Sequence, residues 1–568
     1  MQTTTTVTFS DFEYTRPDLE SFKIKFTELL KRFSESESAG EQLKYIKEIN
    51  SMRMEFDSMQ RLANIRYTIN TKDDFYNQEH DYFDNISPEY KRYIKEYYES
   101  LIKSNYRNII EAKTGSQLFN LAEFGLKTFS SEIMEDLKKE IQLVTRYVKI
   151  ISSAKINFDG KVYNLAGMDP FIQSIDRETR KKASEAMWGF FADNENEIGD
   201  IFDEMVKVRT VISRKLGYEN FVQLGYDRLH RSGYGVSDVE KFRKHVHELF
   251  IPVNQELMER KKRLLGYDKL FNYDSGINFK SGNPTPKGSP EWIVSQAKRM
   301  YEELSAETGE FINFMIDHET LDLYNRENKS PGGYCSSIYK YKTPFIFANL
   351  NGTDHDVKVF THEAGHAFQF YQSMNNEYPE YMHATFDAAE IHSMAMEFIT
   401  HPWMNLFFKE DTDKFLYSHV KRALSFIPYG TSVDEFQHFV YSNPDISHKE
   451  RCRQWRIIEK KYNPGLDYDG FEFLESGGAW MQKPHIFRTP FYYIDYCLAQ
   501  VCALQFWKKF NEDRDAAWND YLKLCKAGGS KPFCELVAEA NLESPFEKAT
   551  VESVVSYAKK YLNENPVE

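Results

Sequence analysis

The sequence predicts a mostly α-helical protein with one small β-sheet. Hydrophobic residues make up 41% of the 568 residues and aromatic residues 15%, as in a well-packed globular protein. Long stretches repeat apolar residues at the spacing of amphipathic helices. One short region instead alternates aromatic and β-branched residues, a pattern typical of strands.

Residues 18–153 show a succession of helical patterns. The first is carried by Leu19, Phe22, Phe26, Leu29, Leu30 and Phe33. Similar series cover residues 90–101 and 133–151. A β-hairpin is then expected at residues 155–165, because Asp159-Gly160 tolerates the positive φ angles of a tight turn.

The rest of the chain is expected to be helical around the small sheet. Helical spacing covers residues 177–265, with breaks at Gly217 and at residues 233–235. The Pro- and Gly-rich residues 281–290 predict a surface loop, short enough to join two helices. Residues 334–350 predict the sheet, and the helical pattern returns from Asp354 to the end.

Charge and cysteine content exclude several classes of protein. A net charge of −14 argues against a nucleic-acid partner, which attracts basic surfaces. No segment has the roughly 18–20 apolar residues of a membrane span, and residues 1–20 lack the features of a signal peptide. We therefore expect a cytoplasmic protein with no membrane partner. The six cysteines form no Cys-x-x-Cys pair, so reduced core or surface thiols are expected.

The clearest chemical signal is the pentapeptide His362-Glu-Ala-Gly-His366. Residues four apart lie on one face of a helix, so two imidazoles can face one zinc ion. Glu363 flanks the pair, and its carboxylate is free to take a proton from metal-bound water. Gly365 costs about 1 kcal/mol relative to alanine inside a helix, which indicates that something packs closely against it.

A third metal ligand is needed, because such a pentapeptide also arises by chance. Residues 387–397 are expected to form a second helix on which Asp387, Glu390 and Glu397 share one stripe. Buried carboxylates need partners. We predict that Glu390 binds the zinc and that Glu397 or Asp387 orients an imidazole N–H. His392 lies on the opposite face and is rejected as a ligand.

At this point the chain resembles the oligoendopeptidase F and thimet oligopeptidase family, in particular its Pz-peptidase-like bacterial members. The likeness spans at least residues 160–500 and is weakest in the N-terminal helices. The stretches that carry it are residues 362–369, 389–393, 396–397, 331–335, 344–351 and 216–221.

The resemblance implies a two-lobed helical ellipsoid with a deep channel that admits unfolded oligopeptides. We expect an N-terminal helical lobe at residues 1–190 and a catalytic zinc-peptidase region at residues 191–568, sharing one channel. The strand around Ala348 and Asn349 would pair with the substrate backbone. Each chain would carry one zinc ion and act as a monomer or a homo-oligomer.

The family also places a histidine and a pair of tyrosines late in the chain. Here His485 is followed by Tyr493 and Tyr496, which share a helix face and would stabilise a developing oxyanion. The loop at residues 486–490 lacks the glycines of the thimet branch, so the tyrosine register is open by one residue. Tyr492 is the alternative, and is otherwise expected to contact substrate.

The predicted activity is therefore a zinc endopeptidase that cuts short, unfolded oligopeptides, with Glu363 as the catalytic base. Two alternatives remain at this stage. One is a dipeptidyl carboxypeptidase or carboxypeptidase of similar build, which would capture the terminal carboxylate with a cationic group. The other is a non-catalytic helical peptide-binding or scaffold protein with a decayed site, which the joint presence of the base and three ligands disfavours.

Overall fold

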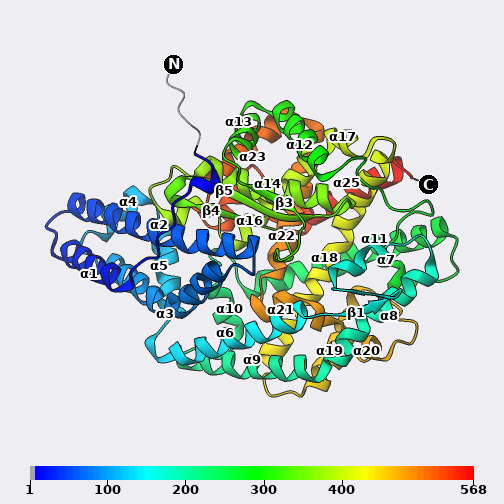
Figure 1. The fold of residues 1–568 in the computed structure, drawn as a ribbon, viewed down its shortest axis with the longest axis horizontal. Helices are drawn as coiled ribbons and strands as arrows, with labels where there is room; N and C mark the ends of the chain where they lie inside the picture. Colours follow the sequence, from blue (N-terminus) through cyan, green and yellow to red (C-terminus); the bar gives the residue numbers. More distant parts are fainter. Residues whose placement is uncertain (1–6, 568) are drawn as a thin grey trace.

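Five N-terminal helices form one end of the molecule in the computed structural model, which describes residues 7–567 (Figure 1). They begin as the sequence predicts: Asp18 accepts the backbone N–H of Ser21, and α1 buries the apolar stripe that includes Phe26 and Phe33. Their bounds are α1 (Leu19–Glu35), α2 (Ala39–Ile69), α3 (Asp74–Ile102), α4 (Arg107–Thr114) and α5 (Gln117–Lys127).

The middle of the chain adds helices and the predicted hairpin. Strands β1 (Ile156–Phe158) and β2 (Lys161–Tyr163) pair antiparallel around Asp159 and Gly160, both of which have positive φ. The helices are α6 (Met134–Ser152), α7 (Asp169–Ile172), α8 (Arg177–Asp193), α9 (Glu195–Lys215), α10 (Phe221–Arg228), α11 (Val236–Leu265), α12 (Pro290–Leu304) and α13 (Ala306–Asp317).

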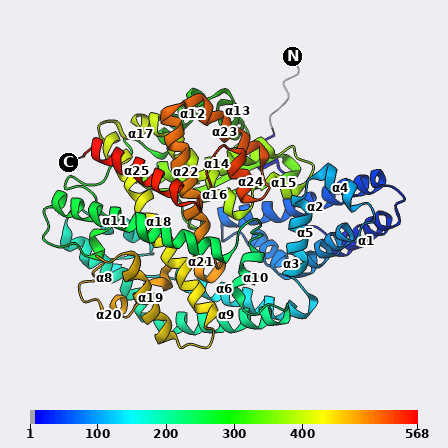
Figure 2. The same ribbon diagram turned by 180° about the vertical axis from the view of Figure 1, so that it is seen from behind.

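The C-terminal part is almost entirely helical, and its last helices, coloured orange to red, lie toward the viewer in Figure 2. Its longer helices are α14 (Asp354–Ser373), α16 (Phe386–Ile399), α18 (Thr412–Ser442), α19 (His448–Tyr462), α22 (Tyr493–Glu512), α23 (Arg514–Ala527), α24 (Phe533–Glu539) and α25 (Lys548–Glu564). The shorter ones are α15 (Pro379–Met382), α17 (Asn405–Phe408), α20 (Glu472–Glu475) and α21 (Pro484–Arg488).

A three-stranded sheet lies between the N-terminal helices and the rest of the molecule. The order is β3-β5-β4, with β5 (Thr343–Leu350) antiparallel to β4 (Tyr334–Ile338) and parallel to β3 (Leu321–Tyr324). Strands β4 and β5 confirm the predicted sheet. The four-residue β3 was not predicted, because so short a segment shows no usable alternation.

The alternation of β5 divides its side chains between two hydrophobic cores. Phe345 and Phe347 belong to the core of the N-terminal helices, whereas Ile346, Ala348 and Leu350 belong to the large core that otherwise runs from Ile133 to Leu562. Both faces are thus covered. The division into lobes at residue 190 stays a prediction, and so does the deep channel.

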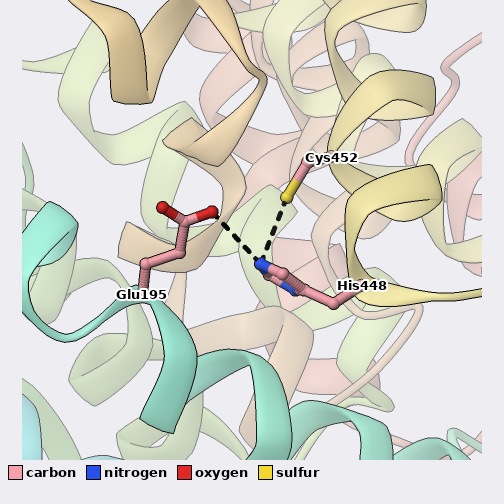
Figure 3. Close-up of side chains that lie close together, drawn as sticks. All are labelled: Glu195, His448 and Cys452. Atoms are coloured by element: carbon pink, nitrogen blue, oxygen red, sulfur yellow. Dashed lines mark hydrogen bonds and ion pairs between the residues drawn. The ribbon is translucent and has the colours of Figure 1, made fainter.

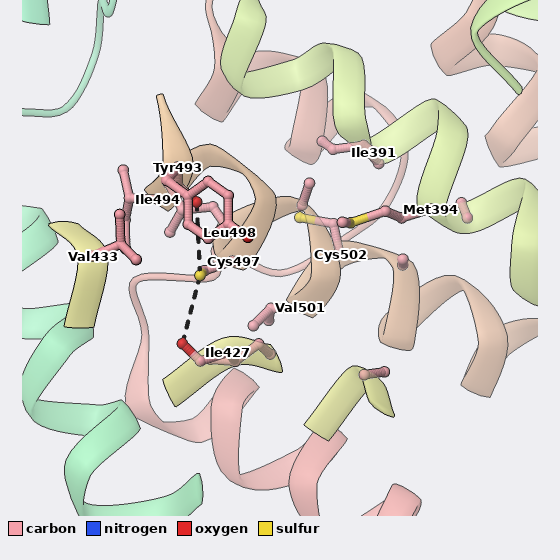
Figure 4. Close-up of a cluster of buried hydrophobic side chains, with 14 of the residues drawn as sticks. Ile391, Met394, Ile427, Val433, Tyr493, Ile494, Cys497, Leu498, Val501 and Cys502 are labelled. Carbon is pink, nitrogen blue, oxygen red and sulfur yellow. Dashed lines mark hydrogen bonds between the residues drawn. The ribbon is translucent and has the colours of Figure 1, made fainter. Parts of the chain in front are cut away.

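In the large core, α16 and α18 both pack against α22 (Figure 4). Ile391 and Met394 of α16 lie in the same cluster as Ile427 of α18 and Leu498 of α22, and all four are buried. This packing fixes α16 against the start of α22. Within residues 7–567, the structure contains no helix with the length and apolarity needed to cross a membrane.

Candidate metal centre

The HExxH segment lies on α14, directly after the central strand β5, and packs against α16. The contact is closest at Gly365. A Cβ atom there would lie 2.6 Å from the carbonyl oxygen of His392 and 2.7 Å from Cα of Ser393. No side chain fits into so small a gap, so the predicted close packing at Gly365 is confirmed. Because Gly365 has no side chain, the backbones of α14 and α16 come close enough for side chains of the two helices to meet.

Three side chains converge at this helix pair. The Oε2 atom of Glu390 lies 3.3 Å from Nε2 of His362 and 3.5 Å from Nε2 of His366. Donors about 2.0–2.1 Å from a tetrahedral zinc ion are separated from one another by about 3.3 Å. The spacing and the nitrogen and oxygen donors therefore suit a zinc ion, and the same three residues form one of the two candidate metal clusters within residues 7–567.

Carboxylates hold the first imidazole in place. The Nδ1 atom of His362 donates to Oε1 of Glu397 at 2.7 Å, which leaves Nε2 free for a metal. Burial acts to lower the pKa of His362, but the hydrogen bonds to Glu390 and Glu397 raise it to about 10. The site thus strongly favours positive charge.

Of the two predicted positioning residues, Glu397 and not Asp387 meets the imidazole. The Asp387 carboxylate accepts a hydrogen bond from Oγ1 of Thr385 at 2.6 Å, in the first turn of α16. Asp387 lies three residues before Glu390, and its hydrogen bond within residues 7–567 goes to Thr385 and not to a histidine. This placement does not support the alternative role for Asp387.

The Glu397 carboxylate is also hydrogen-bonded to a pair of histidines in series, which sequence reasoning missed. Its Oε2 atom accepts from Nε2 of His419 at 2.8 Å, and Nε2 of His401 lies 2.8 Å from Nδ1 of His419. Lys358 adds a positive charge 3.9 Å from the same carboxylate oxygen. His419 belongs to α18 and has no spacing relation to the motif, so no sequence signal could have found it.

Glu363 lies beside the His362, His366 and Glu390 group without joining it. Its side chain is buried, and Oε1 lies 3.8 Å from the position that a Cβ atom of Gly333 would occupy. Burial raises the pKa of Glu363 above its ordinary value, while the two histidines of the motif act against this. A carboxylate in such surroundings accepts a proton more readily than one in water.

The tyrosine pair that faces Glu390 is Tyr492 and Tyr496, one residue off the first predicted register. The phenol of Tyr492 donates to Oε1 of Glu390, and the Tyr496 ring lies 4.9 Å from the Tyr492 ring. Tyr493 points elsewhere, because its hydroxyl accepts from Nζ of Lys483 at 3.1 Å. The oxyanion role predicted for Tyr493 is not supported by this placement, and the alternative register with Tyr492 is favoured.

His485 lies next to Tyr493 and Tyr496. Its ring centre is 5.7 Å from that of Tyr496 and 4.9 Å from that of Tyr493. Burial lowers the pKa of His485 to about 4, so the imidazole is neutral at pH 7. Burial also raises the pKa of Tyr496, whose phenol therefore keeps its proton. The neutral imidazole of His485 and the protonated phenol of Tyr496 can each donate a hydrogen bond.

A buried ion pair holds the start of α22, where these tyrosines lie. Phe491 adopts a left-handed backbone with φ of 67°, and its carbonyl oxygen accepts from Nη2 of Arg231 at 2.6 Å. The same Nη2 atom lies 2.5 Å from Asp495, and both side chains are fully buried. Gly225 makes room for the Phe491 ring, which a Cβ atom would approach to 2.4 Å.

The predicted pairing of substrate with residues 348 and 349 lacks support at Ala348. The strand is central in the sheet, Ala348 is fully buried, and its carbonyl oxygen accepts from Nζ of Lys329. The side-chain amide of Asn349 donates to the carbonyl oxygens of Ser330 and Gly332 at 2.9 and 2.8 Å. It therefore ties down the loop before β4, and a substrate contact of Asn349 stays a prediction.

Comparisons with known proteins agree with this geometry. The sequence model of the peptidase M3 N-terminal domain matches residues 9–129, and that of peptidase family M3 matches residues 294–556. A solved structure of Pz peptidase A with an inhibitor is 51% identical, with a TM-score of 0.95 over 98% of this chain and 99% of that one. The chain belongs to peptidase family M3. The predicted family, the mostly helical fold and the metallopeptidase class are thereby confirmed.

Three further proteins are similar to this chain. A solved structure from Bacillus anthracis, assigned as an oligoendopeptidase F, is 48% identical with a TM-score of 0.90 over 98% of both chains. The oligoendopeptidase F homolog of Borreliella burgdorferi is 25% identical over 412 residues, which are 69% of this chain and 66% of that protein. Oligopeptidase PepF of Bacillus subtilis is 20% identical over 390 residues, 66% of this chain and 55% of that one. The match thus spans less than two thirds of these two curated relatives.

Proposed function

We propose that this M3 peptidase is a zinc-dependent oligoendopeptidase that cuts short, unfolded peptides. The observation that carries the proposal is the convergence of His362, His366 and Glu390 at tetrahedral spacing, with Glu363 buried beside them. These three residues would hold the ion. When bound, zinc would polarise the scissile carbonyl and lower the pKa of water from 15.7 to about 7.

The side chains of the chain itself would then handle protons and charge. Glu363 would accept a proton from the attacking water and pass it to the leaving amine. Tyr496 and neutral His485 would donate hydrogen bonds to the charge that develops on the carbonyl oxygen, while the O–H of Tyr492 would stay on Glu390 and position that carboxylate. Their buried surroundings support this role, because hydrogen bonds in a low-dielectric site are stronger than in water.

The substrate class is tested with end-blocked quenched peptides of increasing length. We expect internal cleavage of short peptides, loss of activity with a chelator and recovery on adding zinc. Mass spectrometry of the products separates an endopeptidase from a carboxypeptidase, because only the former cuts a peptide whose C-terminus is blocked. Products released only from free C-termini would overturn the proposal.

We further propose a cytoplasmic location and no membrane or nucleic-acid partner. The absence of a nucleic-acid partner fits the net charge of −14.

A further inference from the structure

A second cluster of metal-binding side chains lies where the start of α9 meets the start of α19 (Figure 3). Glu195 is the first residue of α9, and His448 and Cys452 lie one turn apart on α19. One ligand atom from each lies within 4.8 Å of the others. His448 is central: its Nε2 atom is 3.3 Å from Oε1 of Glu195 and 3.5 Å from Sγ of Cys452.

These separations match the edges of a zinc tetrahedron. With bonds of about 2.0–2.1 Å to nitrogen or oxygen and about 2.3 Å to sulfur, nitrogen lies about 3.3 Å from oxygen and about 3.6 Å from sulfur. The geometry of the cluster is therefore close to that of the catalytic ligands. A thiolate, an imidazole and a carboxylate together suit zinc and not magnesium or calcium, which prefer oxygen.

The surroundings are shaped for the imidazole. Gly199, one turn after Glu195 in α9, faces the His448 ring, and a Cβ atom there would lie 2.7 Å from Nδ1 of His448. A glycine inside a helix costs about 1 kcal/mol relative to alanine, and here its missing side chain makes room for the ring. All three ligands line a surface cavity of about 1020 Å³, which gives access from solvent and room for a water as fourth ligand.

We propose that Glu195, His448 and Cys452 form a second, non-catalytic zinc site that ties α9 to α19. The site lies on helices other than α14 and α16, so its role would be structural. Burial raises the pKa of the Cys452 thiol to about 11, and the bound cation would displace that proton to solvent. Zinc that binds the folded chain alone would raise its unfolding temperature. Cys452 would then differ from the ordinary reduced thiols that the sequence suggests.

Cobalt titration distinguishes this site from the catalytic one, whose predicted ligands include no cysteine. We would titrate Co²⁺ into the metal-free, full-length His366→Ala variant and record the thiolate-to-cobalt charge-transfer absorption. One equivalent should produce the band. Adding Cys452→Ser should abolish it, whereas the matched Cys534→Ser, at a partly exposed cysteine outside the cluster, should keep it. No band at saturating Co²⁺, or a band that survives Cys452→Ser, would overturn the proposal.

A second variant guards against loss of folding, because Cys452 is buried. Glu195→Gln changes a partly exposed side chain. We expect it to weaken Co²⁺ binding at least about tenfold with an unchanged unfolding temperature of the metal-free protein. Unchanged Co²⁺ affinity would contradict the three-residue site. Cys452→Ser alone should retain peptidase activity, which separates this proposal from the proposed function.

Discussion

Three glutamates lie close together at the catalytic centre, and their surroundings assign them different tasks. Glu390 faces the Nε2 atoms of His362 and His366, as the proposed metal ligand would. Glu397 accepts from two imidazoles and orients one of them. Glu363 has no such partner and keeps a raised pKa because of burial. Residue type alone does not distinguish these roles.

Replacing the proposed base should separate chemistry from metal binding. Glu363→Gln keeps the shape of the side chain but cannot accept a proton. We expect a loss of about 10²-fold or more in kcat, with zinc content unchanged in elemental analysis. Near-normal kcat in the zinc-loaded variant would contradict the role of Glu363.

Replacing the positioning carboxylate should act on the metal instead. Glu397→Gln removes the charge that holds His362 and His419. We expect about 10–100-fold weaker zinc binding in a competition titration, and a smaller effect on kcat once zinc is saturating. Asp387→Asn is the matched control on the same helix. Because its carboxylate contacts no histidine, zinc affinity should stay unchanged, and a loss equal to that of Glu397→Gln would restore the rejected alternative.

The contact between α14 and α16 decides whether the three proposed ligands meet. Gly365 permits an approach that no other residue could allow, since a Cβ atom would lie 2.6 Å from a backbone oxygen. The side-chain alignment of His362 and His366 comes from one helix, but their distance to Glu390 depends on this contact. The helix pair is therefore the structural unit of the site.

A pair of glycine substitutions tests this contact. Gly365→Ala should destabilise the protein by about 1–3 kcal/mol in denaturant unfolding and weaken zinc binding, because the helices must move apart. Gly189→Ala is the control, since a Cβ atom at this position of α8 meets nothing within 4 Å. It should stabilise the protein by up to about 1 kcal/mol. Equal effects of the two variants would show that close approach is not what matters.

Across the whole molecule, a buried charge network links the early helices to the segment that carries His485. Arg209 of α9 donates to Glu140 of α6 at 2.7 Å and also to the carbonyl oxygen of Phe487, two residues after His485. Arg228 of α10 lies 3.0 Å from the same glutamate. Arg209 thus joins elements more than 200 residues apart in the chain, and Glu140 holds its guanidinium in place.

This network predicts a pH dependence of stability. Burial acts to raise the pKa of Glu140, but Arg228 and Arg209 outweigh it and lower that pKa from 4.5 to about 2. The resulting stabilisation, on the order of 2–3 kcal/mol, is present above pH 4.5 and is lost as the pH falls through about 2. Glu140→Gln should therefore lower the unfolding temperature strongly at pH 7 and much less near pH 2.5.

The control for this prediction is Glu204→Gln on α9. Glu204 pairs with Lys139 and Arg146 at the surface, and exposed pairs contribute little. Its unfolding temperature should follow the wild type at both pH values. A pH-independent effect of Glu140→Gln would contradict the assignment.

The sequence by itself determined the features that depend on local periodicity. Helical spacing aligns His362 with His366 and separates Glu363 from them, and strand alternation predicted β4 and β5. The sequence also pointed to Glu390 as the third proposed ligand, because it lies on an apolar helix where a carboxylate needs a partner.

Only the tertiary structure decided which side chains meet across elements. It places Glu397, and not Asp387, at the His362 imidazole, and Tyr492, and not Tyr493, at Glu390. It also places His419 at Glu397 and Glu195 near Cys452. A rotation of about 100° per residue turns a one-residue uncertainty in register into a different helix face. Contacts between distant helices further depend on how closely the backbones pack, as at Gly365, and no spacing within one segment encodes that distance.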